Sequence, residues 1–427
     1  MNLKFDPYKF ESFLSDGIPV YFKSIPWANG FVYIRVTVQV GARHDPIGKE
    51  GLAHFFEHLP FDGCAGFPTF EAIQDIDQLL FLDTLNANTA FERTNFTAKV
   101  SSEKLGEGMD FMRHFILEPV LDSSEIERER TVIAQEIWRR YVNERVEALR
   151  RKINKLLYGE HDFGRSDTAL GWHDTVAGIS KDDFVAFHKA YYHSGNIKIV
   201  LVGDIDEHKA KEAVTYFTKH CPKGASVEVA SPISQWPKPE VPEFVTSMGE
   251  YLGLSGSALP RKTDIVVSRL LPLYENEEVL WLAQKLLRKS IFEQVRGKIG
   301  STYSPNVNLS ISPDHSKITI RIEVEPVRLG EVRVIISDII SEIGRGEEKY
   351  IKAFDEVKKS YIQRKYLVDD SACEISDNSV NQLAATGRIT PHSDDISSAE
   401  KVMYADVVNL FSKELNPDQL FWTMLTP

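Results

Sequence analysis

The chain has 427 residues, of which 42% are hydrophobic, so it is long enough for two or more globular domains with substantial cores. Its formal net charge of −12 argues against nucleic acid as a partner and is compatible with a mild preference for basic peptides. Three widely spaced cysteines argue against a disulfide framework and against a cysteine-based metal site.

No segment of the sequence is apolar over a length that could span a bilayer. The first residues carry neither an apolar run of signal-peptide length nor an arginine-rich presequence. We therefore expect a soluble, cytoplasmic protein without a membrane partner.

Strands and helices alternate along the first half. Phe31 to Val40 alternates strictly, with five β-branched residues on one face, which predicts a half-buried strand. The other elements predicted in this half are a strand at Thr94–Val100, a helix at Ser102–Ile116, one long helix at Ser123–Leu157, a helix at Lys181–Tyr192 and a strand at Ile197–Val202.

The stretch His54-Phe55-Phe56-Glu57-His58 follows the first predicted strand and is the most informative motif in the chain. Side chains at positions i and i+4 share one face of a helix, so His54 and His58 can both bind one tetrahedral zinc ion. Glu57 lies beside them and can take a proton from a water that the metal activates. The order His-x-x-Glu-His is the inverzincin signature of zinc hydrolases. Because so short a motif also arises by chance, a third ligand is required.

The predicted helix at Ser123–Leu157 can supply that ligand. Glu129 and Glu136 are seven residues apart, two turns along one face, and three isoleucines run close to the same side. A carboxylate on a face that otherwise looks buried needs a partner, and a metal or a metal ligand would be one. The alternative is that these acids are solvated surface charge, as most glutamates on such a helix are.

With both motifs in view, the chain resembles the pitrilysin, insulin-degrading enzyme and mitochondrial processing peptidase family of zinc metallopeptidases, in its shorter, two-domain bacterial-type branch. The resemblance implies that Glu136 completes the zinc site of His54 and His58, and that Glu129 orients a ligand histidine. It covers nearly the whole chain, and further segments that carry it are Gly41–Pro46, Gly51–Ala53, Asn86–Thr89, Phe163–Arg165 and Val202–Asp204.

The resemblance also implies how substrate and partner chains are bound. A peptide would lie as an extended strand beside Asn86, Ala87 and Thr89, with backbone pairing giving affinity and little sequence preference. Members of this branch work as dimers that enclose a chamber, so we expect a homodimer or a heterodimer with a related chain. Two departures from the family concern local geometry. Pro60 should disturb the hydrogen bond to the Phe56 carbonyl, and Leu82-Asp83 stands where the family often has two glycines.

An internal repeat pairs Asp183 through Ile197 with Asp406 through Leu420 without a gap, each as a helix, a short turn and a strand. We therefore predict an α+β fold of two similar domains, each a mainly antiparallel sheet packed with helices, that form a clamshell. The predicted domains are a zinc-binding peptidase domain (1–220), a proline-rich linker (221–243) and a metal-free, substrate-binding domain (244–427). Elements predicted in the second half are strands at Ile265–Leu270 and Lys317–Val324 and helices at Glu277–Arg296 and Val327–Ile343.

The second predicted domain has no histidine in its helix at Glu277–Arg296, so metal chemistry belongs to the first half. Arg296 and Tyr303 are similar to the family's Arg-x6-Tyr element, which the resemblance assigns to holding the substrate. A guanidinium and a phenol can donate to a peptide carbonyl or to a developing oxyanion. The alternative is an arginine whose charged head reaches solvent and a tyrosine in a sheet.

These predictions together indicate a zinc metalloendopeptidase or oligopeptidase acting on small or unfolded peptides. His54, His58 and Glu136 would hold Zn²⁺, Glu57 would act as general base, and Arg296 and Tyr303 would hold the substrate. One alternative is a non-catalytic or helper subunit of a heterodimeric processing peptidase, although helpers arise by losing this set of residues. Another is a zinc-dependent binding module, which gives Glu57 no role.

Overall fold

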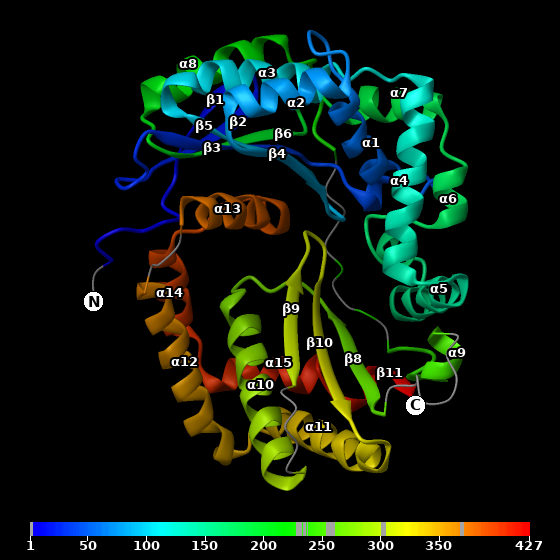
Figure 1. The fold of residues 1–427 in the computed structure, drawn as a ribbon. Coiled ribbons are helices and arrows are strands. Elements are labelled where there is room, and N and C mark those ends of the chain that lie inside the picture. Colours follow the sequence, from blue (N-terminus) through cyan, green and yellow to red (C-terminus); the bar gives the residue numbers. More distant parts are fainter. Residues whose placement is uncertain are drawn as a thin grey trace.

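The structure is a computed structural model that describes residues 3–227, 233, 236, 238–252, 261–299, 305–367 and 371–427, without the side chains of residues 83 and 84. It consists of two α/β halves, each with one mixed, mainly antiparallel sheet packed with helices (Figure 1). The predicted fold class is therefore confirmed.

The first sheet has six strands in the order β1-β2-β6-β3-β5-β4, so β4 is an edge strand. Every neighbouring pair is antiparallel except β2 and β6. The strands are β1 (Glu11–Ser15), β2 (Ile18–Ser24), β3 (Phe31–Val38), β4 (Phe81–Thr89), β5 (Thr94–Ser101) and β6 (Ile197–Gly203). The strand predicted from Phe31 is thus correct but ends two residues earlier than expected.

Helices α3 and α8 cover one face of this sheet (Figure 1). The apolar residues of β3 and β6 that point to this face are fully buried, which explains their alternating pattern. The helices of the first half are α1 (Leu52–His58), α2 (Phe70–Leu80), α3 (Leu105–Leu117), α4 (Ser123–Tyr141), α5 (Glu144–Tyr158), α6 (His173–Ala177), α7 (Lys181–Tyr191) and α8 (Glu207–His220).

The single helix predicted at Ser123–Leu157 is wrong, because the chain breaks between α4 and α5. Val142 adopts φ 63°, a conformation that no helix contains. Asn143 then caps α5, its side-chain oxygen accepting hydrogen bonds from the backbone N–H groups of Arg145 and Val146 at 3.0 Å. Asparagine is among the preferred N-cap residues, so the sequence did contain a signal for this break.

The second sheet has five strands in the order β7-β11-β8-β10-β9. They are β7 (Glu243–Ser247), β8 (Thr263–Leu271), β9 (Asn306–Ile311), β10 (Ser316–Val324) and β11 (Phe421–Thr426). Strand β11 pairs parallel with β7 and antiparallel with β8, just as β6 pairs parallel with β2 and antiparallel with β3. The repeat found in the sequence therefore corresponds to equivalent strands at equivalent places in the two sheets.

The core of the second half lies between this sheet and helices α10, α11, α12 and α15. The helices of this half are α9 (Met248–Leu252), α10 (Glu278–Ile299), α11 (Leu329–Gly344), α12 (Ile351–Tyr366), α13 (Ala372–Thr386), α14 (His392–Lys401) and α15 (Tyr404–Lys413). None of the helices in the described ranges combines the length and the apolar character needed to cross a membrane.

Helix α13 leaves the second half and packs on the face of the first sheet opposite α3 and α8 (Figure 1). Its Ile375, Val380 and Leu383 form one buried cluster with Val200 and Val202 of β6. Because both faces of β6 are covered, its sequence is apolar almost throughout. The predicted boundaries at residues 220 and 243 remain predictions, and part of the predicted linker lies outside the described residues.

Candidate active site

Helix α1 carries the His-x-x-Glu-His motif and is held in place at its N-terminus. Its N-terminus is held by Asp45, whose carboxylate accepts hydrogen bonds from the N–H groups of Gly51 at 2.7 Å and Ala53 at 2.8 Å. Gly51 adopts φ +102°, and a Cβ there would lie 2.6 Å from the Leu170 carbonyl oxygen, so only glycine fits. The anchored helix therefore has a fixed position against the first sheet.

The C-terminus of α1 confirms the effect predicted for Pro60. The α-helix ends at His58, and a 3₁₀ turn follows over Leu59–Asp62. The carbonyl of Phe56 accepts its hydrogen bond from the Leu59 N–H, because Pro60 has no N–H to offer. The His-x-x-Glu-His motif thus forms the last five residues of a short helix.

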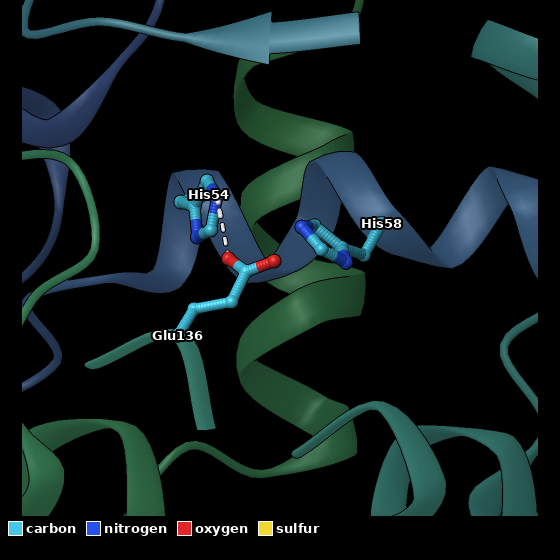
Figure 2. A group of neighbouring side chains, drawn as sticks. All are labelled: His54, His58 and Glu136. Atoms are coloured by element: carbon cyan, nitrogen blue, oxygen red, sulfur yellow. Dashed lines mark ion pairs between the residues drawn. The ribbon is translucent and has the colours of Figure 1, made fainter. Parts of the chain in front are cut away.

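The two histidines of α1 meet Glu136 from α4, and the three side chains point toward one another (Figure 2). One donor atom from each lies within 4.8 Å of the other two. The His54 Nε2 to Glu136 Oε2 distance is 3.7 Å. Phe55 and Phe56 point to the opposite side of α1 and are fully buried. The two histidines therefore point away from the core of the first half.

Zinc fits this set of donors. Two ligands about 2.1 Å from one zinc ion at the tetrahedral angle lie about 3.4 Å apart, close to the separation of His54 and Glu136. Burial and, less strongly, the charge of His58 lower the pKa of His54 to about 3, so its ring is neutral at pH 7 and can offer a lone pair. Three protein ligands leave a fourth position, as in catalytic zinc sites.

Glu129 contacts His58 on the side away from the other ligands. The His58 Nδ1 lies 3.1 Å from Glu129 Oε2, which leaves His58 Nε2 for a metal. Burial opposes the charged form of His58, but this hydrogen bond and the charges of Glu57 and Glu136 outweigh burial and raise its pKa. The Nδ1 of His54, in contrast, has no hydrogen-bond partner among the described residues. Glu129 therefore orients one of the two histidines.

The Glu129→Gln substitution is expected to weaken zinc binding by roughly 10- to 100-fold, the usual effect of removing a carboxylate that holds a ligand histidine. Competition with a chromophoric chelator would measure this change. Glu127→Gln is the matched control, because Glu127 is exposed on the same helix and pairs only with Arg130 within the described part of the chain. Equal zinc affinity in both variants would contradict the role of Glu129.

Glu57 lies beside the ligands with only 6% of its surface exposed. The Thr89 hydroxyl at the end of β4 donates to Glu57 Oε2 at 2.6 Å. Burial raises the pKa of Glu57, and the hydrogen bond from Thr89 partly offsets this. A carboxylate with a raised pKa accepts a proton more readily, which suits a general base.

A cavity of about 520 Å³ contains all of these groups. Asn86, Ala87 and Thr89 form one wall, on the open edge of the first sheet. Leu82 and Asp83 lie further back in the same strand, where the pairing of β4 with β5 shifts register. The structure thus brings eight of the ten predicted site residues together: His54, Glu57, His58, Asn86, Ala87, Thr89, Glu129 and Glu136.

The remaining two predicted site residues are not part of this cavity. Arg296 is exposed near the end of α10, with its guanidinium 5.7 Å from the Phe292 ring. The first turn of α10 lines the space between the halves. Arg296 is 18 residues further on, so it lies about 27 Å away along the helix axis. Tyr303 lies outside the described residues.

Sequence reasoning missed two residues that support the site, Asp45 and Arg128, and one role of a third, Thr89. Asp45 holds the start of α1, and Thr89, predicted only to contact substrate, holds Glu57. Arg128 Nη1 lies 3.2 Å from Glu129 Oε1, and its guanidinium also donates to Asp62, which lines the cavity. Nothing in the local sequence indicates these contacts, because each joins segments that only the fold brings together.

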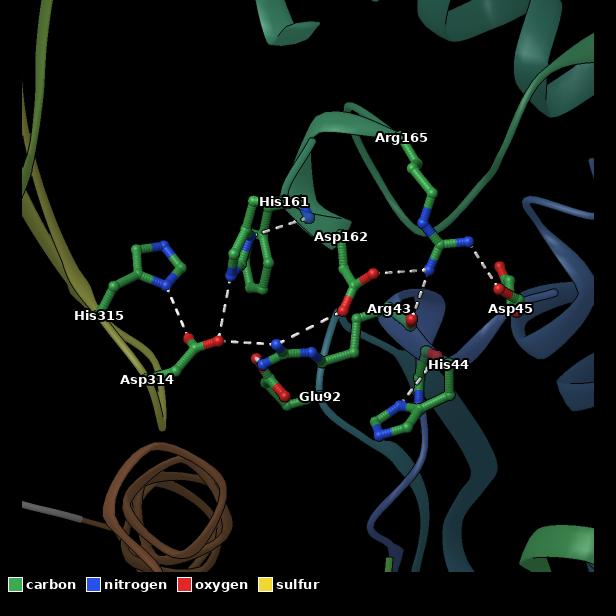
Figure 3. A network of polar contacts seen from close by, with 11 residues as sticks. Arg43, His44, Asp45, Glu92, His161, Asp162, Arg165, Asp314 and His315 are labelled. Carbon is green, nitrogen blue, oxygen red and sulfur yellow. Dashed lines mark hydrogen bonds and ion pairs between the residues drawn. The ribbon is translucent and has the colours of Figure 1, made fainter. Parts of the chain in front are cut away.

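A second cluster of histidine and carboxylate side chains joins the two halves (Figure 3). Asp314, in the turn between β9 and β10, is 1% exposed and accepts hydrogen bonds from Arg43 Nη2 at 2.7 Å and His161 Nε2 at 3.1 Å. His315 Nδ1 lies 2.7 Å from the other Asp314 oxygen, and Glu92 Oε1 accepts from Arg43 Nη1 at 2.8 Å. Burial would raise the pKa of Asp314, but these hydrogen bonds outweigh it and hold that pKa well below its usual range.

This cluster is a junction and not a metal centre. The Phe163 N–H donates to His161 Nδ1 at 3.2 Å, so the proton of the neutral ring sits on Nε2, the atom that faces Asp314. Arg43 competes for the same carboxylate oxygen. Arg165 donates to the carbonyl oxygens of Arg43 at 2.6 Å and Asp45 at 2.7 Å, which ties the junction to the segment before α1.

The Asp314→Asn substitution is expected to lower the free energy of unfolding by about 3 kcal/mol, because it leaves the buried Arg43 with one partner fewer. The pKa of Asp314 is lowered on folding, so its contribution is complete above the ordinary value of 3.8 and is lost as the pH falls below it. Urea denaturation at pH 7 and pH 3 would measure both effects.

Asp162→Asn is the control for this experiment. Asp162 Oδ2 lies 3.7 Å from Arg43 Nη2, but its side chain is half exposed. Removing that charge should cost less than about 1 kcal/mol. Equal losses in the two variants would show that Asp314 has no special place in the junction.

Comparison with known proteins agrees with this geometry. The family model described as Insulinase (Peptidase family M16) matches residues 27–167, and that described as Peptidase M16 inactive domain matches residues 178–356. An uncharacterized zinc protease of Rickettsia felis is 22% identical over 94% of this chain and 93% of its own length. Mitochondrial-processing peptidase subunit beta of Saccharomyces cerevisiae is 27% identical over 51% of this chain and 46% of its own length.

Solved structures share the fold over the whole chain. The crystal structure of a protease from Helicobacter pylori aligns with a TM-score of 0.78 and 18% identity, covering 98% of this chain and 100% of that one. Two sheets packed with helices, with a His-x-x-Glu-His motif on helix α1 of the first half, define a two-domain protein of the pitrilysin type. The chain belongs to peptidase family M16. Its second half matches the inactive domain, in line with the lack of histidine in α10.

Proposed function

We propose that the chain is a zinc-dependent peptidase that hydrolyses small or unfolded peptides. The observation that carries this proposal is the convergence of His54, His58 and Glu136 on one point, with the buried carboxylate of Glu57 beside it. The zinc proteases among its relatives support it. A helper subunit, the alternative, would have no use for a general base held in place by Thr89.

The residues of the chain divide the chemistry among them. A zinc ion held by His54, His58 and Glu136 would lower the pKa of a water and polarise the scissile carbonyl. Glu57 takes the proton of the attacking water and delivers it to the leaving amine. Thr89 uses Oε2 of Glu57, which leaves Oε1 as the oxygen that accepts this proton.

The edge strand β4 is the proposed site for the peptide backbone. Its outer side has no neighbouring strand among the described residues, so its free backbone groups can pair with an extended peptide. Asn86, Ala87 and Thr89 line the zinc cavity on this strand. A peptide paired there would pass in front of Glu57.

A dimer is the proposed working form. Arg296 lies too far from the cavity of its own chain to contact a peptide there, so a second chain must present it if it holds substrate. The presence of both the zinc ligands and Arg296 in one sequence favours a homodimer, and a heterodimer with a related chain is the alternative. In such a dimer, Arg296 of each chain would hold the substrate at the zinc site of the other chain.

Metal analysis and peptide hydrolysis test the proposed function together. The purified protein is expected to hold one zinc per chain and to cleave a quenched peptide library, with activity lost to a chelator and restored by zinc. His54→Ala should lose the metal, whereas His208→Ala, at a side chain that is 89% exposed, should keep it. Zinc-loaded protein that cleaves no peptide would support the helper alternative.

A further inference from the structure

A groove of about 530 Å³ lies in the second half and is lined by residues of the neighbouring helices α10 and α12. Its charged lining residues are four cations and one acid: Lys285, Arg288, Lys289, Arg364 and Glu356. The chain as a whole has 62 acidic and 50 basic residues. The groove therefore has the opposite charge to the rest of the molecule.

Most of this positive charge has no carboxylate beside it. Lys289 Nζ lies 2.6 Å from Glu356 Oε2, so the one acid of the groove is already paired. Over the described ranges, neither Arg288 nor Arg364 has a carboxylate oxygen within 4.0 Å. Lone surface cations are usually only solvated, but here several share one groove.

The cations of the groove also repel one another. Lys285 Nζ lies 5.3 Å from the centre of the Tyr361 ring, at the bottom of the groove. Burial and then the charges of Arg364 and Arg288 lower the pKa of Lys285. A fold that holds like charges together without local partners gives up stability, which is typical of a site where a ligand supplies the missing charge.

Three of these cations begin a stripe on α10 that leads out of the groove. Lys285, Arg288 and Lys289 are followed by Phe292 and Arg296 at helical spacing, so all lie along one side of α10. Lys285 also lines the cavity between the two halves. The stripe thus connects the inside of the molecule to Arg296, the residue expected to hold substrate.

We propose that this groove binds the carboxylates of an acidic peptide segment and that the protein prefers peptides with aspartate or glutamate beyond the scissile bond. The proposal rests on the proposed peptidase function and on the proposed dimer, in which Arg296 of one chain serves the zinc cavity of the other, and it names the substrate class. The continuity of the stripe with Arg296 favours a peptide over a free phosphate compound, which offers similar oxygens. Guanidinium groups suit this role because they bind carboxylates with two parallel hydrogen bonds.

The test is direct binding of two labelled peptides to the full-length Glu57→Gln variant in the presence of zinc, so that no cleavage intervenes. The peptides are identical except that three glutamates in one are glutamines in the other. The acidic peptide is expected to bind about tenfold more tightly, as partly solvated ion pairs allow, and less so at high salt. Adding Arg288→Gln and Arg364→Gln should bring the two affinities within about twofold.

Adding Lys189→Gln and Lys219→Gln instead is the control, since it removes the same charge from exposed helices of the first half. This control should keep the preference. Three results would each overturn the proposal. The two peptides could bind equally well, the preference for the acidic peptide could survive the groove substitutions, or it could be lost in the control. The protein could instead bind tripolyphosphate through Arg288 and Arg364 and bind the two peptides equally. That result would assign the groove to phosphate. Failure of the wild type to hydrolyse either peptide would count against the peptidase and not against the groove.

Discussion

Glu57→Gln is expected to fold and bind zinc like the wild type while losing peptide hydrolysis by about 10²- to 10⁴-fold, the range that a general base contributes. The amide can still accept the hydrogen bond from Thr89, so the geometry of the site should persist. It cannot accept the proton of the attacking water. Initial rates on a quenched peptide, at equal zinc content, would measure the loss.

Thr89→Val provides the graded comparison, because it removes the donor to Glu57 and keeps the carboxylate. A loss of about tenfold is expected, in keeping with one hydrogen bond to a charged group. Turnover by Glu57→Gln close to that of the wild type would remove Glu57 from the mechanism. The opposite order, with Thr89→Val the more damaging, would make position 89 and not 57 the centre of the chemistry.

Two inactive variants are expected to restore activity when mixed, if one chain presents Arg296 to the zinc site of the other. Glu57→Gln alone lacks the base, and Arg296→Ala alone should lose more than about tenfold by losing a donor near the scissile bond. In a mixed dimer, one site combines the intact zinc cavity of the second variant with the Arg296 of the first. Equal amounts, unfolded together and refolded, should therefore recover about a quarter of the wild-type rate.

The matched control mixes Glu57→Gln with His54→Ala, which both damage the same cavity and should restore nothing. Recovery confined to the first mixture would support a homodimer. No recovery in either, with both variants dimeric by light scattering, would mean that Arg296 acts in its own chain or not at all. Variants that stay monomeric while the wild type is active would contradict the dimer itself.

Two of the three proposed zinc ligands could be predicted because their geometry is local. His54 and His58 share a helix face by spacing alone, whereas Glu136 lies on another helix and was assigned through the resemblance to the family. The break at Val142 lies beyond these residues, so the wrong prediction of a single helix did not disturb the site. Strand β3 could also be predicted from local sequence, because the alternation of its apolar residues reflects which side chains face the core.

The contacts that support the site could not be predicted, because they join distant segments. Asp314 and Arg43 are 271 residues apart and meet only after both sheets have formed. Helix α13 shows no sign in its sequence that it covers the sheet of the other half. Arg296 was expected to hold the substrate. The direction of α10 places it at the far end instead, which a one-dimensional pattern cannot reveal.

The position of α13 has a consequence for how the chain is made. The first sheet is complete when Gly203 has left the ribosome, but the helix that covers one of its faces begins only at Ala372. At about 5–20 residues per second, roughly 10 to 30 s of synthesis separate the two events. Throughout that interval Val200, Val202 and Ile25 face water, so the nascent first half exposes an apolar surface that only about the last eighth of the polypeptide can cover. Ribosomes that translate one message would bring several such surfaces close together before the sheet is covered, which is the condition that favours association of unfinished chains.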